Sequence, residues 1–428
     1  MEKNRKIEWY IPMVIILMSA FYFWGLPSVP FHPDESTQIF MSKDLKILFT
    51  DPISLAYHPN QTLSTESRYR AIDAPLTRYL IGAGRLLFDI PDLESDWNWS
   101  ESWEENVNSG SLPDSDQLLI SRISVSFLFT LSLLLFYFSM RRLLPSHLVL
   151  LSILLFGLHP LLLLHTRRAM AESGLLFGTT FFLWASTRDN KNAWLIGLAL
   201  AIAFNAKQTA LVLLPVGILS ACLVPKTKDY IKTIVLQISR LLVIFILFTT
   251  LLNPFFWKNP LGAINISIQE RAVLSEKQKE DHLGDSDISI RSIPRQFLAG
   301  VYNIYISEPQ TEEVGNYIED IEIQKGRYFS NPVISWGRNL IVGSILFTIS
   351  LFGIVYHFRN FSKFSNTKKN SLIVILLATI CLFLIILYLI PWQRYAVPIL
   401  PFAVFWIISG FLPITDYLQH GRDNSSTK

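Results

Sequence analysis

The sequence predicts an all-helical protein that crosses a membrane several times, and three observations support this fold class. Hydrophobic residues make up 50% of the chain and charged residues 17%, whereas a soluble domain carries about 25% charged residues. About ten apolar runs recur along the sequence, most of them close to the length of a membrane-spanning helix. Basic residues gather in alternate loops between these runs. We therefore expect residues 1–428 to form a single polytopic membrane domain.

The first apolar run extends from Ile7 to Pro30 and follows three basic residues, Lys3, Arg5 and Lys6. It is long and lacks a small-residue cleavage site, so we interpret it as a retained first helix and not as a secretion signal. Together with the later runs it gives about ten spans. The further expected spans are 119–139, 146–163, 170–187, 193–205, 208–224, 233–252, 337–357, 371–390 and 395–413.

The charges of the short loops predict the orientation of the chain. If the N-terminus lies in the cytoplasm, every loop expected on that side contains basic residues, as the positive-inside rule requires. We therefore expect both termini in the cytoplasm, a cell (inner) membrane as the location, and two long loops, 28–117 and 253–335, on the outer side. The basic residues of the expected inner loops and of the C-terminus are Arg141, Arg142, Arg188, Lys191, Lys226, Lys228, Lys232, Arg359, Lys363, Lys368, Lys369, Arg422 and Lys428.

The first outer loop is expected to contain an amphipathic helix and an acidic segment. Apolar residues recur at helical spacing between Leu76 and Leu87, so residues 76–88 are predicted to form a helix on the membrane surface. Residues 89–116 hold nine acidic residues and neither Lys nor Arg. The tryptophans of this segment either anchor the loop at the membrane interface or form a platform for a sugar ring. They are Trp97, Trp99 and Trp103. The second outer loop is polar and is expected to be partly helical.

Charge and cysteine content argue against several other classes of protein. The net charge is only +3, and the basic residues lie in short loops, so we expect no binding to nucleic acid. The two cysteines, Cys222 and Cys381, lie inside or at the end of apolar runs. They have neither the pattern of a disulfide framework nor the spacing of a zinc site.

An acidic pair, Asp34 and Glu35, follows directly on the first apolar run and is expected at the outer face of the membrane. Carboxylates are unfavourable near hydrocarbon, so a pair at this position indicates a functional site. A solvated helix cap is the structural alternative.

Further charged residues are expected at the same interface. Arg167 and Glu172 lie in the outer turn before the fourth span, Lys207 lies between the fifth and sixth, and Arg394 follows the ninth. Each has a structural alternative: Glu172 matches a helical ion pair with Arg168, and single basic residues at helix ends extend toward lipid headgroups. Headgroup contacts alone do not explain why these cations gather with acids on the side that is poor in basic residues.

Carboxylates beside several cations at a membrane surface suit one type of reaction. The cations can hold a lipid phosphate and stabilise the charge that it gains as a leaving group. A carboxylate can take the proton from an attacking hydroxyl. The inferred reaction is group transfer from a phospholipid-type carrier to an acceptor outside.

At these residues the sequence resembles the GT-C glycosyltransferases of the protein O-mannosyltransferase and aminoarabinose-transferase type, in particular their shorter bacterial members. The resemblance extends over almost the whole chain in motif order. The segment His32-Pro33-Asp34-Glu35 is similar to the family's acidic motif, whose aspartate is the proposed catalytic base. Asp73-Ala74-Pro75-Leu76-Thr77-Arg78 is similar to the family's His-Pro-Pro-Leu-Gly-Lys motif, but only Pro75 and Leu76 are unchanged.

The other motifs of that family also have counterparts. Arg122 corresponds to an arginine that often opens the second span, and Lys207 to a lysine after the fifth. Arg167 to Glu172 is similar to an arginine and an aspartate five residues apart, with Glu172 in place of the aspartate. Arg394-Tyr395 resembles an Arg-Tyr segment near the end of the chain.

The resemblance implies an inverting enzyme with a GT-C fold that transfers a single sugar from a polyprenyl-phosphate carrier to an extracytoplasmic acceptor. Asp34 is then the general base, and Glu35 is a second catalytic residue that, like Glu172, orients the base or binds the sugar. Lys207, Arg167 or Arg394 binds the carrier phosphate. Sugar or acceptor contacts are expected from Glu172, His32 and Tyr395. The expected partners are the donor, membrane lipids, and an acceptor protein, lipid or polysaccharide.

We expect no cofactor, but a metal site is an alternative, because His32, Asp34, Glu35 and Glu172 offer ligands for a divalent cation. Two other functions stay open. The first alternative is a transporter or flippase for a lipid-linked saccharide, although no internal repeat supports it. The second is an oligosaccharide ligase or polymerase that uses a diphosphate carrier.

Overall fold

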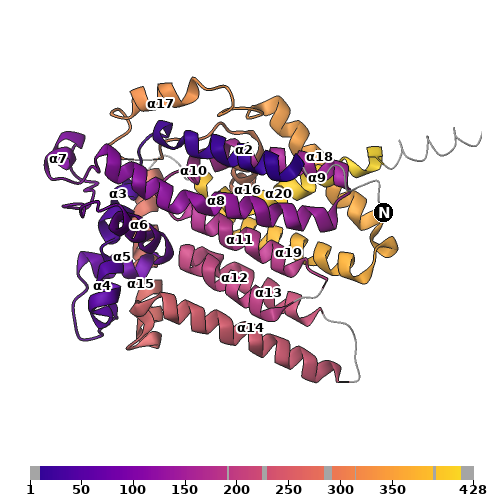
Figure 1. The fold of residues 1–428 in the computed structure, drawn as a ribbon, viewed down its shortest axis with the longest axis horizontal. Coiled ribbons are helices and arrows are strands. Elements are labelled where there is room, and N and C mark those ends of the chain that lie inside the picture. The colour runs from indigo at the N-terminus through magenta and orange to yellow at the C-terminus, as the bar shows by residue number, and fades with distance from the viewer. Residues whose placement is uncertain are drawn as a thin grey trace, which may run out of the picture.

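The computed structural model describes residues 10–189, 192–223, 229–283, 292–313, 315–388 and 392–415, and side chains within 279–283 are not described. These residues form helices and no β-strand (Figure 1). Several residues used for the predicted orientation lie outside the described residues. They are Lys3, Arg5, Lys6, Lys191, Lys226, Lys228, Arg422 and Lys428.

Among the described residues, six helices are long and apolar enough to cross a membrane. The chain is therefore an all-helical, multi-pass membrane protein, but the predicted count of ten spans is not confirmed. The six are α2 (Tyr10–Trp24, extended by η2, Leu26–Ser28), α8 (Ser115–Leu143), α14 (Tyr230–Leu252), α18 (Leu340–Arg359), α19 (Asn366–Tyr388), and η9 (Gln393–Ile399) continued by α20 (Leu400–Ser409).

The other expected spans are shorter helices that lie inside the bundle. At a rise of about 1.5 Å per residue, the 15 residues of α11 cover less than a bilayer core. The expected span at 146–163 divides at His159, because Pro160 cannot donate the backbone hydrogen bond that would continue the preceding helix. These helices are α9 (Ser146–Gly157), α10 (Pro160–His165), α11 (Glu172–Ser186), α12 (Ala193–Ala206), η4 (Gln208–Leu213) and α13 (Leu214–Cys222).

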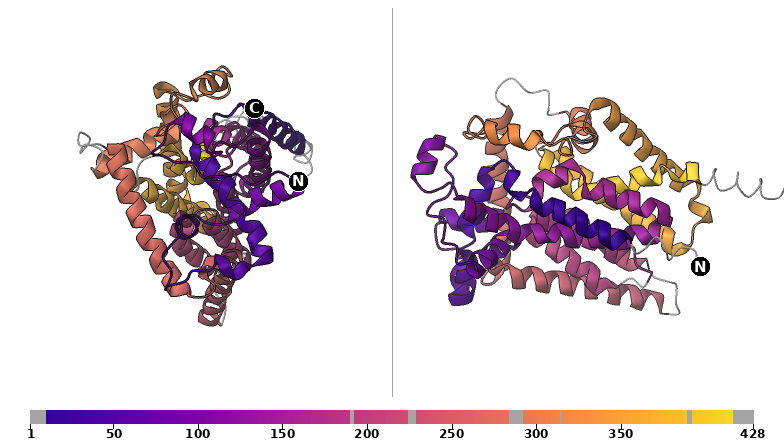
Figure 2. Two further views of the ribbon diagram at one scale, coloured as in Figure 1. Left: turned by 90° about the vertical axis from the view of Figure 1, so that its left-hand side faces the viewer. Right: turned by 45° about the horizontal axis from the view of Figure 1, so that its top comes forward.

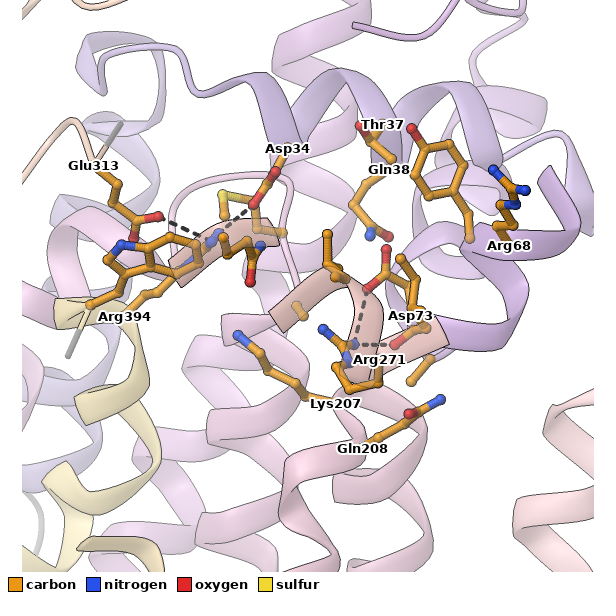
Figure 3. Close-up of a pocket in the computed structure, with 18 of the residues that line it drawn as sticks. Asp34, Thr37, Gln38, Arg68, Asp73, Lys207, Gln208, Arg271, Glu313 and Arg394 are labelled. Atoms are coloured by element: carbon orange, nitrogen blue, oxygen red, sulfur yellow. Dashed lines mark hydrogen bonds and ion pairs between the residues drawn. The ribbon is translucent and has the colours of Figure 1, made fainter. Parts of the chain in front are cut away.

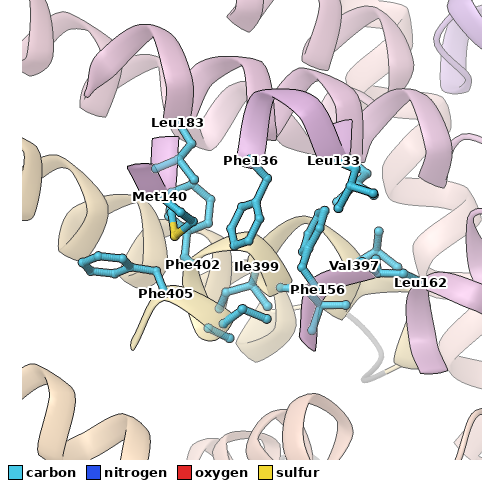
Figure 4. Packing of buried hydrophobic residues seen from close by; sticks show 14 of the residues in the cluster. Leu133, Phe136, Met140, Phe156, Leu162, Leu183, Val397, Ile399, Phe402 and Phe405 are labelled. Atoms are coloured by element: carbon cyan, nitrogen blue, oxygen red, sulfur yellow. The ribbon is translucent and has the colours of Figure 1, made fainter. Parts of the chain in front are cut away.

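The apolar core lies where α8, α9, α10 and α20 meet (Figure 4). Phe136 of α8 stacks on Phe156 of α9, with 4.2 Å between the ring centroids. Phe402 of α20 is fully buried in the same cluster. This core fixes α20 and the preceding η9 against the centre of the bundle, and η9 carries two of the predicted site residues, Arg394 and Tyr395.

The two predicted outer loops are largely helical, and the helices of the first loop gather at one end of the bundle (Figures 1 and 2). Between α2 and α8 these are α3 (Pro33–Met41), α4 (Asp44–Thr50), η3 (Pro52–Leu55), α5 (Thr65–Ile72), α6 (Leu76–Leu87) and α7 (Trp103–Asn108). Between α14 and α18 they are η5 (Pro254–Phe256), α15 (Pro260–Leu283), α16 (Ile293–Val301), the π-helical η7 (Tyr302–Ile306) and α17 (Glu322–Phe329); η8 (Phe361–Lys363) follows α18.

The predicted helix at 76–88 is confirmed as α6, but its buried face is not the expected apolar one. Arg78 and Arg85 are buried, whereas Leu86 and Leu87 are exposed. Arg78 lies 3.3 Å from Asp44, so an ion pair helps to fix α6 against α4. The contact of α6 with a membrane surface stays a prediction.

The three tryptophans have different environments. Trp97 is 3% exposed and packs with Trp103 and Phe31 in a cluster that includes Tyr317. The interfacial-anchor interpretation is therefore wrong for Trp97, because its ring is enclosed by protein. Trp99 is 43% exposed, and it lines the cavity described below.

Candidate functional site

The helix that carries the acidic pair begins at a well-formed cap. Pro33 occupies the first turn of α3, where its fixed φ and missing N–H are tolerated. The Asp34 N–H donates to His32 Nδ1 (3.1 Å), and the His32 N–H donates to Glu35 Oε2 (3.1 Å). Burial lowers the pKa of His32 well below its usual range. His32 is thus neutral and serves as a helix cap, and its ring also lines the cavity.

Glu35 points into the protein and has no exposed surface. Arg122 Nε and Nη2 donate to its two oxygens, each at 2.8 Å, and the Ala169 N–H donates to Oε1 at 2.8 Å. Arg122 Nη1 also donates to the carbonyls of Leu26 and Val29. Both carboxylate oxygens are therefore engaged. This arrangement fits the orienting role predicted for Glu35 and argues against direct chemistry on a substrate.

Asp34 lies about 100° further round the helix and lines a cavity. Arg394 Nη1 donates to Asp34 Oδ2, and Arg394 Nη2 lies 3.0 Å from Glu313 Oε2 (Figure 3). Burial is the largest single effect and would raise the pKa of Asp34, but the lowering effects together outweigh it, with the charge of Arg394 first among them and its hydrogen bond adding to it, so that this pKa falls to about 2. Burial raises the pKa of Glu313 to about 7, in spite of the opposing effect of Arg394.

Glu313 was not predicted from the sequence, and no motif marks it. Its loop is held by Gln393, the residue before Arg394. The Gln310 N–H donates to Gln393 Oε1 (2.8 Å), and Gln393 Nε2 donates to Ser307 Oγ (2.7 Å). The position of Glu313 therefore depends on contacts between distant parts of the chain, and local spacing carries no signal of it.

Lys207 and Glu172 form a second ion pair on the cavity wall. Lys207 follows the end of α12, Glu172 opens α11, and their charged groups are 2.8 Å apart. The Lys207 ammonium also lies 4.7 Å from the centroid of the Tyr395 ring. The alternative ion pair between Arg168 and Glu172 does not form, because Arg168 donates instead to the carbonyls of Pro30 and Thr311.

The cavity has a volume of about 830 Å³, and residues of α3, α5, α11, α15 and η9 contribute to its lining. It brings together six of the eight predicted site residues: Asp34, His32, Glu172, Lys207, Arg394 and Tyr395. The cavity lining also contains polar residues that the sequence analysis did not single out. They are Thr37, Gln38, Thr65, Arg68, Tyr69, Ser100, Gln208, Glu270, Arg271, Lys277, Gln278 and Glu313.

Arg167 is not part of the cavity lining. Its guanidinium is buried and donates to the carbonyls of Tyr22 and Phe21, both at 3.0 Å. It thereby closes the end of α2, where carbonyls have no partner within the helix. This placement argues against the predicted phosphate-binding role of Arg167, because its buried guanidinium contacts backbone carbonyls and lies outside the cavity lining.

Arg271 of α15 is a further cation of the cavity lining; it donates to the Ile72 carbonyl and lies 3.7 Å from Asp73 (Figure 3). Both side chains of this ion pair are more than a third exposed. Burial raises the pKa of Asp73.

For a metal ion, no group of three or more His, Cys, Asp or Glu side chains with suitable placement occurs in the part of the chain that the structure describes. Two of the four ligands considered above are engaged elsewhere, because Glu35 faces Arg122 and Glu172 faces Lys207. The need for a metal ion stays untested.

No protein-family model matches the sequence, and no curated protein matches it significantly. The protein O-mannosyltransferase Pmt1-Pmt2 complex of S. cerevisiae bound to the sugar donor is similar in structure, with 15% identity, 62% of this chain and 34% of that chain covered, and a TM-score of 0.41. The Archaeoglobus fulgidus oligosaccharyltransferase in the apo form has 11% identity, 97% and 52% coverage, and a TM-score of 0.49.

The same archaeal oligosaccharyltransferase in complex with Zn and sulfate has 12% identity, 95% and 50% coverage, and a TM-score of 0.48. This chain thus spans between about a third and about half of the length of these similar chains. At such identities and TM-scores, membership of a family does not follow from the similarity.

Proposed function

We propose that the chain is a membrane glycosyltransferase with a GT-C fold that transfers a single sugar from a polyprenyl-phosphate carrier to an acceptor hydroxyl or phosphate. One observation carries this proposal. Asp34, Arg394 and Lys207 come from three separate elements and line one cavity at the end of a bundle of apolar helices.

The residues supply what this reaction needs. Lys207 and Arg394 hold the carrier phosphate and stabilise the negative charge that develops on it. The acceptor oxygen forms a bond to the anomeric carbon while the bond from that carbon to the phosphate oxygen breaks. Asp34 takes the proton of the acceptor, and the carrier phosphate leaves with the bonding electron pair. Direct displacement inverts the configuration at the anomeric carbon.

The sharing of Arg394 couples donor binding to the strength of the base. In the free cavity Arg394 contacts Asp34 and Glu313. A phosphate that binds Arg394 competes with these carboxylates. Asp34 then loses the cation that lowers its pKa and becomes a better proton acceptor. The base is thus activated only when the leaving group is in position.

Three further residues have supporting roles. Glu172 holds Lys207 in place, the Tyr395 ring lies against its ammonium, and His32 caps the helix that presents Asp34. We propose that the cavity faces the extracytoplasmic side of a cell membrane, with both termini in the cytoplasm, and that neither an organic cofactor nor nucleic acid takes part. Loss of turnover with a chelator, and its recovery with a divalent ion, would instead favour the metal-dependent alternative.

The test is turnover of the purified full chain in lipid with a panel of radiolabelled polyprenyl-phosphate sugars. We expect wild type to release carrier phosphate from one donor, and Asp34→Asn to lower the rate about 10²- to 10⁴-fold without loss of folded protein. Asp116→Asn is the control, because it removes an exposed carboxylate outside the cavity lining. Near-normal turnover by Asp34→Asn contradicts the assignment of the base.

The same panel separates the two alternative functions. Consumption of only a polyprenyl-diphosphate saccharide indicates a ligase or polymerase. If folded wild type consumes no carrier, transport becomes the better hypothesis, and movement of a labelled lipid-linked saccharide across vesicles is the next measurement.

A further inference from the structure

The cavity has a second cationic region that the proposed reaction does not use. It consists of Arg68, Arg271 and Lys277, and we call it the outer cationic region. In Figure 3, Arg68 lies on the side of the view opposite Arg394 and Glu313, and Arg271 lies between them, beside Asp73.

Two helices build this region. Arg68 belongs to α5, and α15, which packs against α5, carries the other two cations. The cavity-lining residues of α15 recur at helical spacing, so one face of this helix points into the cavity. These residues are Glu270, Arg271, Val273, Leu274, Lys277 and Gln278.

The charges of this region are available to a ligand. Within the part of the chain that the structure describes, neither Arg68 nor Lys277 has a side-chain ion pair or hydrogen bond. Arg271 donates to the Ile72 carbonyl, and its only side-chain ion pair in the described residues is the 3.7 Å pair with Asp73, in which both side chains are more than a third exposed; such pairs contribute little. Three cations face two carboxylates, Asp73 and Glu270, in the lining here, so the region keeps a net positive charge.

A buried oxygen lies next to Asp34 and has no partner. Gln38 follows Asp34 by about one turn of α3 and also lines the cavity. Its Oε1 is buried without a hydrogen bond, which is unfavourable for a polar atom. A ligand hydroxyl beside Asp34 would supply the missing donor. In the view of Figure 3, Gln38 lies between Asp34 and Arg68.

We propose that the outer cationic region binds an anionic group, a phosphate or a carboxylate, of the acceptor, while a hydroxyl of the same molecule lies between Gln38 and Asp34. This inference rests on the proposed function, whose donor phosphate occupies Lys207 and Arg394. The acceptor is then an anionic alcohol, either a soluble one or a lipid headgroup.

The first test measures binding alone and is independent of turnover. Glycerol 1-phosphate is titrated calorimetrically into the purified full chain, with glycerol as the neutral probe. We expect the Kd for glycerol 1-phosphate to rise about tenfold in Arg68→Ala/Lys277→Ala, because two charged hydrogen-bond donors are removed. Arg295→Ala/Arg327→Ala is the matched control. Both of its side chains are exposed and lie outside the cavity lining, so we expect an unchanged Kd.

The second test separates the two sources of the anion. Transfer is measured from one fixed donor to glycerol 1-phosphate, to phosphatidylglycerol vesicles, and to glycerol. For the anionic acceptor that the protein uses, we expect Arg68→Ala/Lys277→Ala to raise KM about tenfold, with an unchanged donor KM. An effect on phosphatidylglycerol alone identifies a lipid headgroup, and an effect on glycerol 1-phosphate identifies a soluble acceptor.

Several outcomes overturn the inference: equal Kd values for wild type and Arg68→Ala/Lys277→Ala, an equal loss in the control double variant, or no binding of glycerol 1-phosphate by wild type. Absence of turnover with every donor is a failure of the proposed function instead, and the binding measurement still decides the inference.

Discussion

Asp34 and Glu35 are neighbours in the sequence but belong to two different regions of the molecule. Glu35 lies in a buried polar layer beneath α3, where it and Arg122 are enclosed and every oxygen has a donor. Asp34 lies on the cavity wall, where it shares Arg394 with Glu313, and the Arg394 Nε has no partner. Complete hydrogen bonding marks the structural pair, whereas shared and incomplete bonding marks the groups that a ligand can engage.

The largest expected effect comes from a substitution that disrupts the buried pair of Glu35 and Arg122. Glu35→Gln leaves Arg122 as an unpaired buried charge, which typically costs about 3–5 kcal/mol. We expect a much lower yield of monodisperse protein after mild heating, whereas Asp34→Asn should heat like wild type. Glu35→Gln/Arg122→Met should recover part of the loss, because it removes both charges. A heat-stable Glu35→Gln protein without turnover would show instead that Glu35 acts in the chemistry.

The next prediction compares Lys207 and Arg167, two cations for which the sequence analysis predicted the same role, phosphate binding. Lys207 lines the cavity, whereas Arg167 closes α2 inside the protein. Lys207→Met should lower kcat/KM for the donor about 10²- to 10³-fold, because charge on the leaving phosphate is no longer stabilised. Arg167→Met should lower the amount of folded protein but leave kcat of the folded fraction unchanged.

Two controls sharpen this comparison. Lys207→Met/Glu172→Gln removes the buried partner as well, so a persistent loss of turnover in folded protein is assigned to the missing cation and not to a stranded carboxylate. Lys207→Arg keeps the charge and should restore part of the rate. Equal losses of kcat in Arg167→Met and Lys207→Met would contradict the distinction.

The sequence predicted at which end of the bundle the site residues lie, but not the direction in which each of their side chains points. Hydropathy and the acidic motif were enough to gather Asp34, Lys207 and Arg394 at one end. The difference between Arg167 and Arg168, or between Asp34 and Glu35, is a rotation of about 100° about a helix or turn. Tertiary packing decides that rotation, and a single sequence does not report it.

The predicted count of ten spans is not confirmed, and the reason is related. Hydropathy measures composition over a window, so it does not detect the break at His159 and Pro160 or the short length of α11. Glu313 escaped prediction because its loop has no periodicity. Contacts from Gln393, eighty residues away in the chain, hold that loop against the cavity.

Substitution of Glu313 has the smallest expected effect, but it tests most directly how Arg394 is shared between Asp34 and Glu313. Its pKa is about 7, so it is neutral below this pH, and Arg394 then faces one charged carboxylate, Asp34. Above it, Glu313 ionises and holds Arg394 away from the donor phosphate. The raised pKa also means that its contribution to stability is present at low pH and is lost as the pH rises through 7. We therefore expect kcat/KM of wild type to fall above about pH 7, by no more than about tenfold per pH unit.

Glu313→Gln should keep kcat/KM flat between about pH 5 and pH 9, since Asp34 stays ionised over this range. Other groups bear on Glu313 from neighbouring elements: His32, Asp34, Arg168, Glu172, Tyr317 and Arg394. None of them is removed by the substitution. Glu312→Gln is the matched control, because Glu312 pairs with Lys325 outside the cavity lining, and its profile should follow wild type. A Glu313→Gln profile that falls like that of wild type would assign the decline to another group and leave Arg394 committed to Asp34 alone.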